Sequence, residues 1–178
     1  HLKLDDGTGS SAVDSSPHGN NGSLASGTTW VTGRFGQAAR ANGSTGSVQI
    51  PHRTSLHLGA NNADFSVSFW TKLEQGANGQ WRGLAKKGRD WSELAFALYL
   101  PPDSNKINFA VSTANAFNEG DESNGALTVN QWTHVGLVKA GNALTLFLGG
   151  SQDKAVTLSS ATTGNLGSLF FGSAPDDA

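Results

Sequence analysis

The 178-residue sequence predicts an all-β fold, a two-sheet antiparallel β-sandwich. Three observations predict it. Short segments in which apolar and polar residues alternate recur along the chain, Gly and Asn turn signals separate them, and no segment shows a sustained helical period. Many short strands joined by tight turns are typical of two packed sheets. The nine Phe and five Trp indicate an ordered core, and the length favours one domain.

The strands are expected where the alternation is clearest. These segments are residues 48–50, 65–73, 94–100, 107–111, 132–138, 144–148, 156–158 and 169–171. In the second segment, Phe65, Val67 and Phe69 share one face, while Ser66 and Ser68 lie on the other. Asn-Gly pairs at 21–22, 42–43, 78–79 and 124–125 are expected to form turns with positive φ.

Composition excludes several classes of protein. The net charge of −2, from 12 basic and 14 acidic residues, is too even for a nucleic-acid binder or a polybasic membrane arm. The absence of Cys excludes a disulfide scaffold, a zinc-thiolate site and a cysteine nucleophile. No apolar run approaches the roughly 20 residues that span a bilayer, and no signal-peptide pattern is present. Low charge with abundant Gly, Ser, Thr and Asn predicts an extracellular or cell-surface location.

Three stretches taken in order carry a family resemblance. The first, residues 4–38, joins an opening strand and an acidic loop to Trp30 and a Gly-x-x-Gly-x-Ala segment. The second is Asp-Phe-Ser-Val-Ser-Phe-Trp-Thr-Lys at 64–72. The third is Gln-Trp-Thr-His-Val at 131–135, followed by Leu-Thr-Leu-Phe-Leu-Gly-Gly at 144–150. Together they resemble the laminin-G-like, concanavalin A-like lectin superfamily of bacterial type, which implies a jelly roll and a carbohydrate-binding or adhesion role.

The sequence departs from that family at two places. Gly149 stands where the family has Asp, and the family's last strand has no counterpart after Pro175-Asp176-Asp177. We therefore expect residues 1–178 to form one laminin-G-like domain that is truncated or interrupted at its C-terminus and lacks its last strand. The opening strand, His1–Leu4, would then lack a neighbour. A later segment of the same polypeptide, or another chain, would complete the sheet.

The acidic loop near the N-terminus predicts a calcium site. Asp5, Asp6, Asp14 and Asn20 offer hard oxygen ligands of the kind that Ca²⁺ prefers. The family resemblance implies a structural Ca²⁺ at this place. The alternative is that Asp14 begins an ordinary Asx-type turn.

Aromatic residues in polar loops are the candidate carbohydrate-binding residues. Trp81 and Trp91 stand beside Arg82, Arg89 and Asp90, a combination that suits stacking on sugar rings and hydrogen bonding to hydroxyls. The alternative is that the two Trp side chains cap the edge of the sandwich. Phe117 is a weaker third candidate. Trp30, Trp70 and Trp132 are expected to pack in the core.

The basic cluster of Arg82, Lys86, Lys87 and Arg89 has two interpretations. It could attract an anionic polysaccharide. It could also be a solvated edge strand on which Lys blocks aggregation.

Catalysis is not expected. Glu119-Gly120-Asp121-Glu122 is superficially similar to the E-x-D-x-x-E strand of glycosidases on this fold, but Asn occupies position 124 and the segment reads as a loop. Paired catalytic carboxylates need rigid placement. The sequence therefore predicts a non-catalytic carbohydrate-binding or adhesion domain of a larger bacterial surface or secreted protein, stabilised by Ca²⁺. The alternatives are a structural scaffold that carries an inserted lectin domain in an adhesin and, less favoured, a glycoside hydrolase or lyase.

Overall fold

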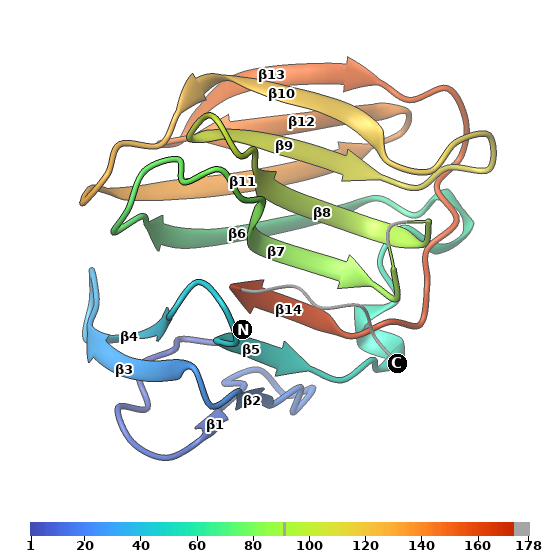
Figure 1. The fold of residues 1–178 in the computed structure, drawn as a ribbon. Coiled ribbons are helices and arrows are strands. Elements are labelled where there is room, and N and C mark those ends of the chain that lie inside the picture. Colours follow the sequence, from blue (N-terminus) through green and yellow to red (C-terminus); the bar gives the residue numbers. More distant parts are fainter. Residues whose placement is uncertain (91, 173–178) are drawn as a thin grey trace.

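A computed structural model describes residues 1–90 and 92–172 of the chain, which form two layers of antiparallel strands (Figure 1). Within this part no helix is long and apolar enough to cross a membrane. The elements are β1 (Ser11–Ala12), β2 (Gly22–Leu24), β3 (Thr28–Thr32), β4 (Gln37–Ala41), β5 (Ser47–Ile50), η1 (Thr54–Leu56), η2 (Ala60–Asn62), β6 (Phe65–Lys72), β7 (Arg82–Gly88), β8 (Leu94–Leu100), β9 (Lys106–Val111), β10 (Glu119–Ala126), β11 (Trp132–Ala140), β12 (Ala143–Leu148), β13 (Ser151–Thr157) and β14 (Leu169–Gly172).

The strands assemble into two main sheets and a small ribbon. The larger sheet has eight strands in the order β1-β2-β5-β14-β7-β8-β9-β10, and the smaller has four in the order β13-β12-β11-β6. The hairpin β3–β4 forms a separate two-stranded ribbon beside β5. Every strand pair is antiparallel, so the predicted two-sheet antiparallel β-sandwich is confirmed.

The main core lies between the four-stranded sheet and strands β7 to β9 of the larger sheet. Alternation explains it, because every second side chain of β6, β11 and β12 points inward. Among its fully buried members are Phe96, Leu98, Phe109, Leu137 and Leu144, all with no measurable exposure.

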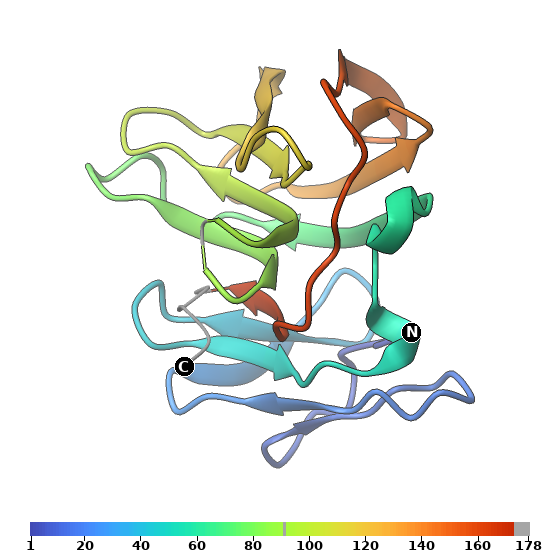
Figure 2. The same cartoon turned by 90° about the vertical axis from the view of Figure 1, so that its right-hand side faces the viewer.

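A second, smaller core lies under the β3–β4 hairpin. Val48 and Ile50 are buried there, and Trp30, Leu56 and Phe171 pack against them. The connection from β13 to β14 runs along one side of the molecule and returns the chain to this lower half (Figure 2). The two cores meet at Leu169 and Phe171 of β14, which pack against both.

Three local predictions are wrong. Residues 1–4 form no strand, because only Leu2 makes an isolated bridge, to Asp14, and Leu4 has a positive φ of 57°. Residues 119–126 form β10 rather than a loop, because β9 supplies a partner for its backbone. Positive φ occurs at Gly43 and Gly79 but not at the other two Asn-Gly pairs, which lie in or beside β2 and β10.

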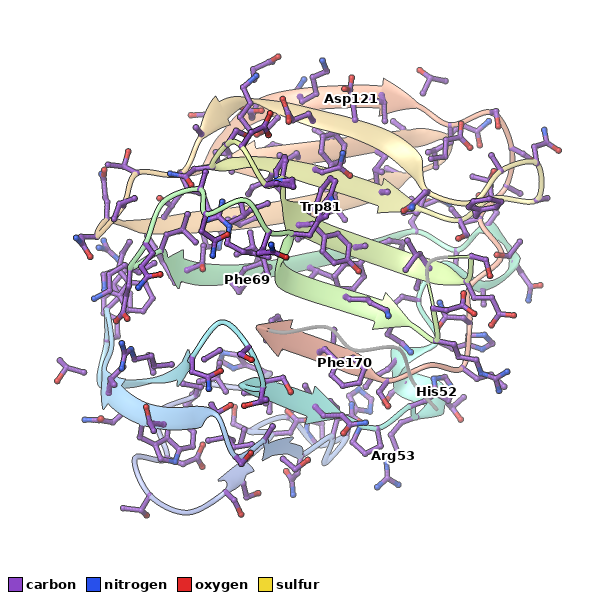
Figure 3. All side chains as sticks on the ribbon, viewed as in Figure 1. His52, Arg53, Phe69, Trp81, Asp121 and Phe170 are labelled. Atoms are coloured by element: carbon purple, nitrogen blue, oxygen red, sulfur yellow. The ribbon has the colours of Figure 1, made fainter. Side chains whose placement is uncertain are left out.

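One edge of the four-stranded sheet lies beside a large cavity. In the described part of the chain β6 pairs with β11 on one side and with no strand on the other. A cavity of about 1140 Å³ lies next to this edge, and residues of β4, β5, β6 and β14 line it. Among these are Val48, Ile50, Leu169 and Phe171, together with Phe69, which Figure 3 labels. The space between β6 and the β3–β4 hairpin is therefore not filled by side chains of the described residues.

Candidate functional site

Asp14 is the organising residue of the acidic loop. Its side chain is 1% exposed and accepts hydrogen bonds from the His1 amino group at 2.6 Å, from the Ser16 N–H and hydroxyl at 2.9 and 2.8 Å, and from the Asn20 N–H at 2.8 Å. The His1 amino group, followed by Ser16, holds the pKa of Asp14 well below its usual range. Together these donors satisfy the hydrogen-bonding capacity of the Asp14 carboxylate without a metal ion.

The side chains of the other predicted calcium ligands have partners other than Asp14. Asp6 accepts a hydrogen bond from the Val13 N–H at 3.3 Å, the Asn20 side chain donates to Ser55, and Asp5 lies against Gly36 of the β3–β4 turn. Within the described residues no group of three His, Asp or Glu side chains could hold a metal ion. The residues as placed do not fit a Ca²⁺ ion, and calcium stays a sequence-based prediction.

The residues of the predicted carbohydrate-binding loops have different surroundings. Trp81 is 59% exposed on the loop before β7 (Figure 3). The Arg82 guanidinium instead donates to the carbonyls of Gln75, Gly76, Pro101 and Ser104 and to the Asn105 side chain, so it fixes loops. Burial lowers the pKa of Arg82.

Asp90 and Arg89 lie in the turn after β7. Asp90 accepts hydrogen bonds from the N–H and hydroxyl of Ser92 and from the Glu93 N–H, so it stabilises that turn, and these bonds lower its pKa. Arg89 is exposed. Trp91 lies outside the described residues.

The interpretation of the basic cluster as a solvated edge or an anion-attracting patch is wrong. Lys86 and Lys87 are 0% exposed, because β7 lies inside the eight-stranded sheet between β14 and β8. The Lys86 amino group donates to the Arg89 carbonyl at 3.4 Å, and that of Lys87 donates to the Gly167 carbonyl. Buried ammonium groups of this kind hold loops rather than bind solvent anions.

The carboxylates of β10 are engaged in holding the sandwich together. Glu119 accepts hydrogen bonds from the hydroxyls of Thr113 and Ser159. Asp121 pairs with Lys154 at 2.9 Å, and Glu122 pairs with Lys106 at 3.2 Å. Each acidic side chain of this segment therefore has a protein partner.

Trp70 lies on the outer face of the four-stranded sheet, and its predicted core position is wrong. Its neighbour Phe69 points inward and packs against Phe171 with ring centres 5.5 Å apart, so Trp70 points outward and is 41% exposed. Trp70 pairs in register with His134 of β11, and their ring centres are 5.2 Å apart.

The tip of the β3–β4 hairpin covers part of Trp70. Gly33 and Gly36 close the turn through a 3.0 Å hydrogen bond from the Gly33 N–H to the Gly36 carbonyl, and Gly36 has a φ of 60°. The two residues between them, Arg34 and Phe35, reach the Trp70 ring. The guanidinium carbon of Arg34 lies 4.1 Å from its centre, and the Phe35 ring meets it edge-on at 6.2 Å.

Trp132 extends the aromatic surface around Trp70, because it belongs to the next outward-facing residue pair of β6 and β11. It pairs in register with Lys72, whose amino group lies 5.4 Å from the centre of the Trp132 ring. Trp132 is half-buried on the outer face and not in either core. We use the term outer-face platform for the set of Arg34, Phe35, Trp70, Lys72, Trp132 and His134. The sequence signal for it was the two-residue period of β6, which groups Trp70 with exposed Ser66 and Ser68.

The fold is shared with known carbohydrate-binding proteins. A TM-score of 0.57 relates the chain to domain 4 of the extracellular GH43 arabinanase from Geobacillus stearothermophilus in complex with arabinotriose, at 19% identity over 81% of this chain and 65% of that chain. The botulinum neurotoxin DC binding domain in complex with SialylT gives 0.70, at 14% identity over 96% of this chain and 42% of that chain.

A third similar structure comes from botulinum neurotoxin type C, whose cell entry is described as dependent upon interaction with two ganglioside molecules. It gives a TM-score of 0.69 at 15% identity, covering 99% of this chain and 43% of that chain. This chain thus spans less than half of each neurotoxin chain. At these identities the similarity shows the fold.

The family is shown by the sequence itself. No curated protein matches the chain. The model of the concanavalin A-like lectin/glucanases superfamily, in its laminin-G form, matches residues 42–178, which is most of the chain. This stretch includes β5 to β14 and therefore most of both sheets. The chain belongs to the concanavalin A-like lectin/glucanases superfamily.

Proposed function

We propose that this chain is a non-catalytic carbohydrate-binding domain that holds its ligand on the outer-face platform. The observation that carries the proposal is the exposure of two adjoining aromatic rings, 70% for Phe35 and 41% for Trp70. Flat aromatic faces provide the apolar contact that sugar C–H groups need, and polar groups beside them fix orientation. Adjoining exposed aromatic rings commonly mark an interaction site.

The similar structures support a carbohydrate as the ligand class. Two of them are complexes with arabinotriose and with SialylT, and the cell entry of the third protein is dependent upon interaction with two ganglioside molecules. The absence of catalysis is supported by the hydrogen-bonded or ion-paired state of Glu119, Asp121 and Glu122. We further propose that the domain works outside the cell in adhesion or polysaccharide binding, as part of a larger bacterial surface or secreted protein.

The test is a glycan array followed by calorimetric titration of the best ligand. Trp70→Ala should weaken binding by about 2 kcal/mol or more, which is roughly a 30-fold rise in Kd. Trp81→Ala is the matched control, because it removes another exposed Trp, from the loop site that the sequence predicts. A loss confined to Trp81→Ala would move the site to that loop. An array without any ligand would overturn the proposed function.

A second candidate function, that of a structural scaffold, is favoured by the free edge of β6. Unpaired N–H and C=O groups along an edge strand are a template for another strand. Here that edge adjoins the 1140 Å³ cavity lined by the apolar side chains of Val48, Phe69 and Phe171. An extended segment with alternating apolar residues would pair with β6 and fill the cavity at the same time.

We propose as this second function that a later segment of the same polypeptide, or another chain, completes the sheet at β6. Amide hydrogen exchange in the 1–178 chain and in the full parent protein tests it. The edge amides of β6 should exchange quickly in the first and slowly in the second, while those of β11 stay protected in both. Equal protection of β6 in both proteins would contradict sheet completion.

A further inference from the structure

The outer-face platform carries two cations that pair with no carboxylate among the described residues. Arg34 contacts the rings of Phe35 and Trp70, and Lys72 contacts the ring of Trp132. Neither takes part in an ion pair in the described part of the chain, in contrast to Arg40, Lys106 and Lys154. Both positive charges are therefore available to a ligand.

We propose that the platform selects glycans that carry a carboxylate, such as uronate- or sialic acid-containing chains. This inference rests on the proposed function and adds the chemical class of its ligand. When a guanidinium group stacks on an aromatic ring, its N–H groups point outward in the guanidinium plane and can still donate to a carboxylate. Arg34 has this arrangement on Trp70, with the exposed ring of Phe35 beside it.

The spacing of the platform suits a sugar unit together with its acidic group. Trp70 and Lys72 are two residues apart on one strand and share its outer face, which places their Cα atoms about 7 Å apart. The aromatic rings of the platform therefore lie on the same face as the charges of Arg34 and Lys72. His134, which contacts Trp70, adds a polar group to the same surface.

The acidic groups near the platform leave its positive character in place. Glu74, at the end of β6, is neutralised by Arg40 at 2.6 Å. Asp5 lies against Gly36 of the hairpin turn and makes no ion pair with Arg34 in the described part of the chain. An approaching carboxylate thus meets Arg34 and Lys72 on the aromatic face. The Lys-rich segment of β7 cannot supply this attraction, because Lys86 and Lys87 are buried.

The test compares anionic glycans with their neutral counterparts on the same protein. Trigalacturonate and sialyllactose are titrated beside galactotriose and lactose, each at low and at high salt. The wild-type chain should bind at least one anionic glycan about tenfold more tightly than its neutral counterpart. This preference should shrink as salt rises, since the platform is exposed.

Charge variants separate this inference from the proposed function. Arg34→Gln and Lys72→Gln should each weaken the binding of anionic glycans more than the binding of neutral glycans, and so remove most of the preference. Arg53→Gln is the matched control, because it removes an exposed cation outside the platform. If the wild type binds anionic and neutral glycans equally well, and Trp70→Ala weakens the binding of both, the preference for acidic glycans is overturned. The proposed function, glycan binding on the platform, is then kept. Failure to bind any glycan would overturn both the preference for acidic glycans and the proposed function. A protein would then be the ligand class to test on this surface.

Discussion

The guanidinium carbon of Arg34, in the turn between β3 and β4, lies 4.1 Å from the centre of the Trp70 ring on β6. This contact joins the β3–β4 hairpin to β6 at the 1140 Å³ cavity, which both residues line. The Arg40–Glu74 pair is a second link between the same elements, and at an exposed site it contributes about 0–1 kcal/mol. The candidate binding surface therefore depends on how firmly this hairpin is held.

Gly33→Ala should loosen the hairpin tip. A Cβ atom at Gly33 would lie 2.4 Å from the Gln37 carbonyl oxygen, so the turn must shift and move Arg34 away from Trp70. We expect a loss of about 1–3 kcal/mol in urea unfolding and a change in Trp fluorescence. Gly76→Ala is the control, because a Cβ there meets nothing closer than 3.8 Å. Equal stability of the two variants would show that the turn is not constrained as described.

Arg82→Lys should lower stability and leave glycan affinity unchanged. Lysine cannot replace a planar group that donates to several loop carbonyls at once. Hydrogen bonds from charged groups contribute roughly 1.5–3 kcal/mol each, so a loss of about 2–4 kcal/mol is expected in thermal or urea unfolding. Exposed Arg89→Lys should have little effect. Reduced glycan affinity with unchanged stability would instead support the loop site that the sequence predicts.

Two Phe truncations should differ because only one residue borders the cavity. Phe96→Ala removes a fully buried ring from the main core and should cost about 3–5 kcal/mol. Phe69 already lines an open space, so Phe69→Ala should cost less, about 1–2 kcal/mol. Urea unfolding of both variants measures the difference. A cost for Phe69→Ala as large as for Phe96→Ala would show that the space around β6 is filled.

Asp14 should make stability depend on pH in the acid range. Its pKa is lower in the folded state than the ordinary value of about 3.9, so its contribution is complete above that value and is lost as the pH falls below it. Asp14→Asn should flatten this dependence, whereas exposed Asp103→Asn should not. Thermal unfolding from pH 7 to pH 2 measures the effect, and identical pH profiles for Asp14→Asn and the wild type would contradict it.

Asp14 also allows the predicted calcium site to be tested. Because hydrogen-bond donors already satisfy Asp14, the described geometry predicts the same melting temperature with EDTA as with added Ca²⁺. If EDTA lowers the melting temperature of the wild type but not that of Asp14→Asn, the result would instead support the sequence-based prediction of a calcium site. A ligand present at 100 times its Kd would add about 2.7 kcal/mol, which thermal unfolding resolves easily.

The alternation of apolar and polar residues in the sequence identified the strands whose inner faces are apolar, such as β6, β8, β11 and β12. It failed for β7 because Lys86 and Lys87 read as solvent-facing, although loop carbonyls accept hydrogen bonds from their buried amino groups. It failed for β10 because that strand has no apolar stripe. Pairing with β9, and bonds from the N–H groups of Asn124 and Gly125 to Asp153, hold it instead.

The platform could be predicted only in part. The two-residue period of β6 groups Trp70 with Ser68, which was enough to place its ring on the outer face. The resemblance to the family's central strand had favoured the core instead. The contribution of Arg34 and Phe35 could not be read from the sequence, because it depends on a hairpin more than 30 residues away folding back onto β6.

Nitrogen-15 NMR titration of the Trp indole N–H signals with the best array glycan tests the central claim most directly. Assignment by single Trp→Phe variants separates Trp70 from Trp30, Trp81, Trp91 and Trp132. The platform predicts that the Trp70 signal shifts most, with a smaller shift of Trp132, and that Trp81 and Trp30 stay in place. A shift confined to Trp81, or to no Trp at all in the presence of measured binding, would contradict a ligand site on the outer face of the four-stranded sheet.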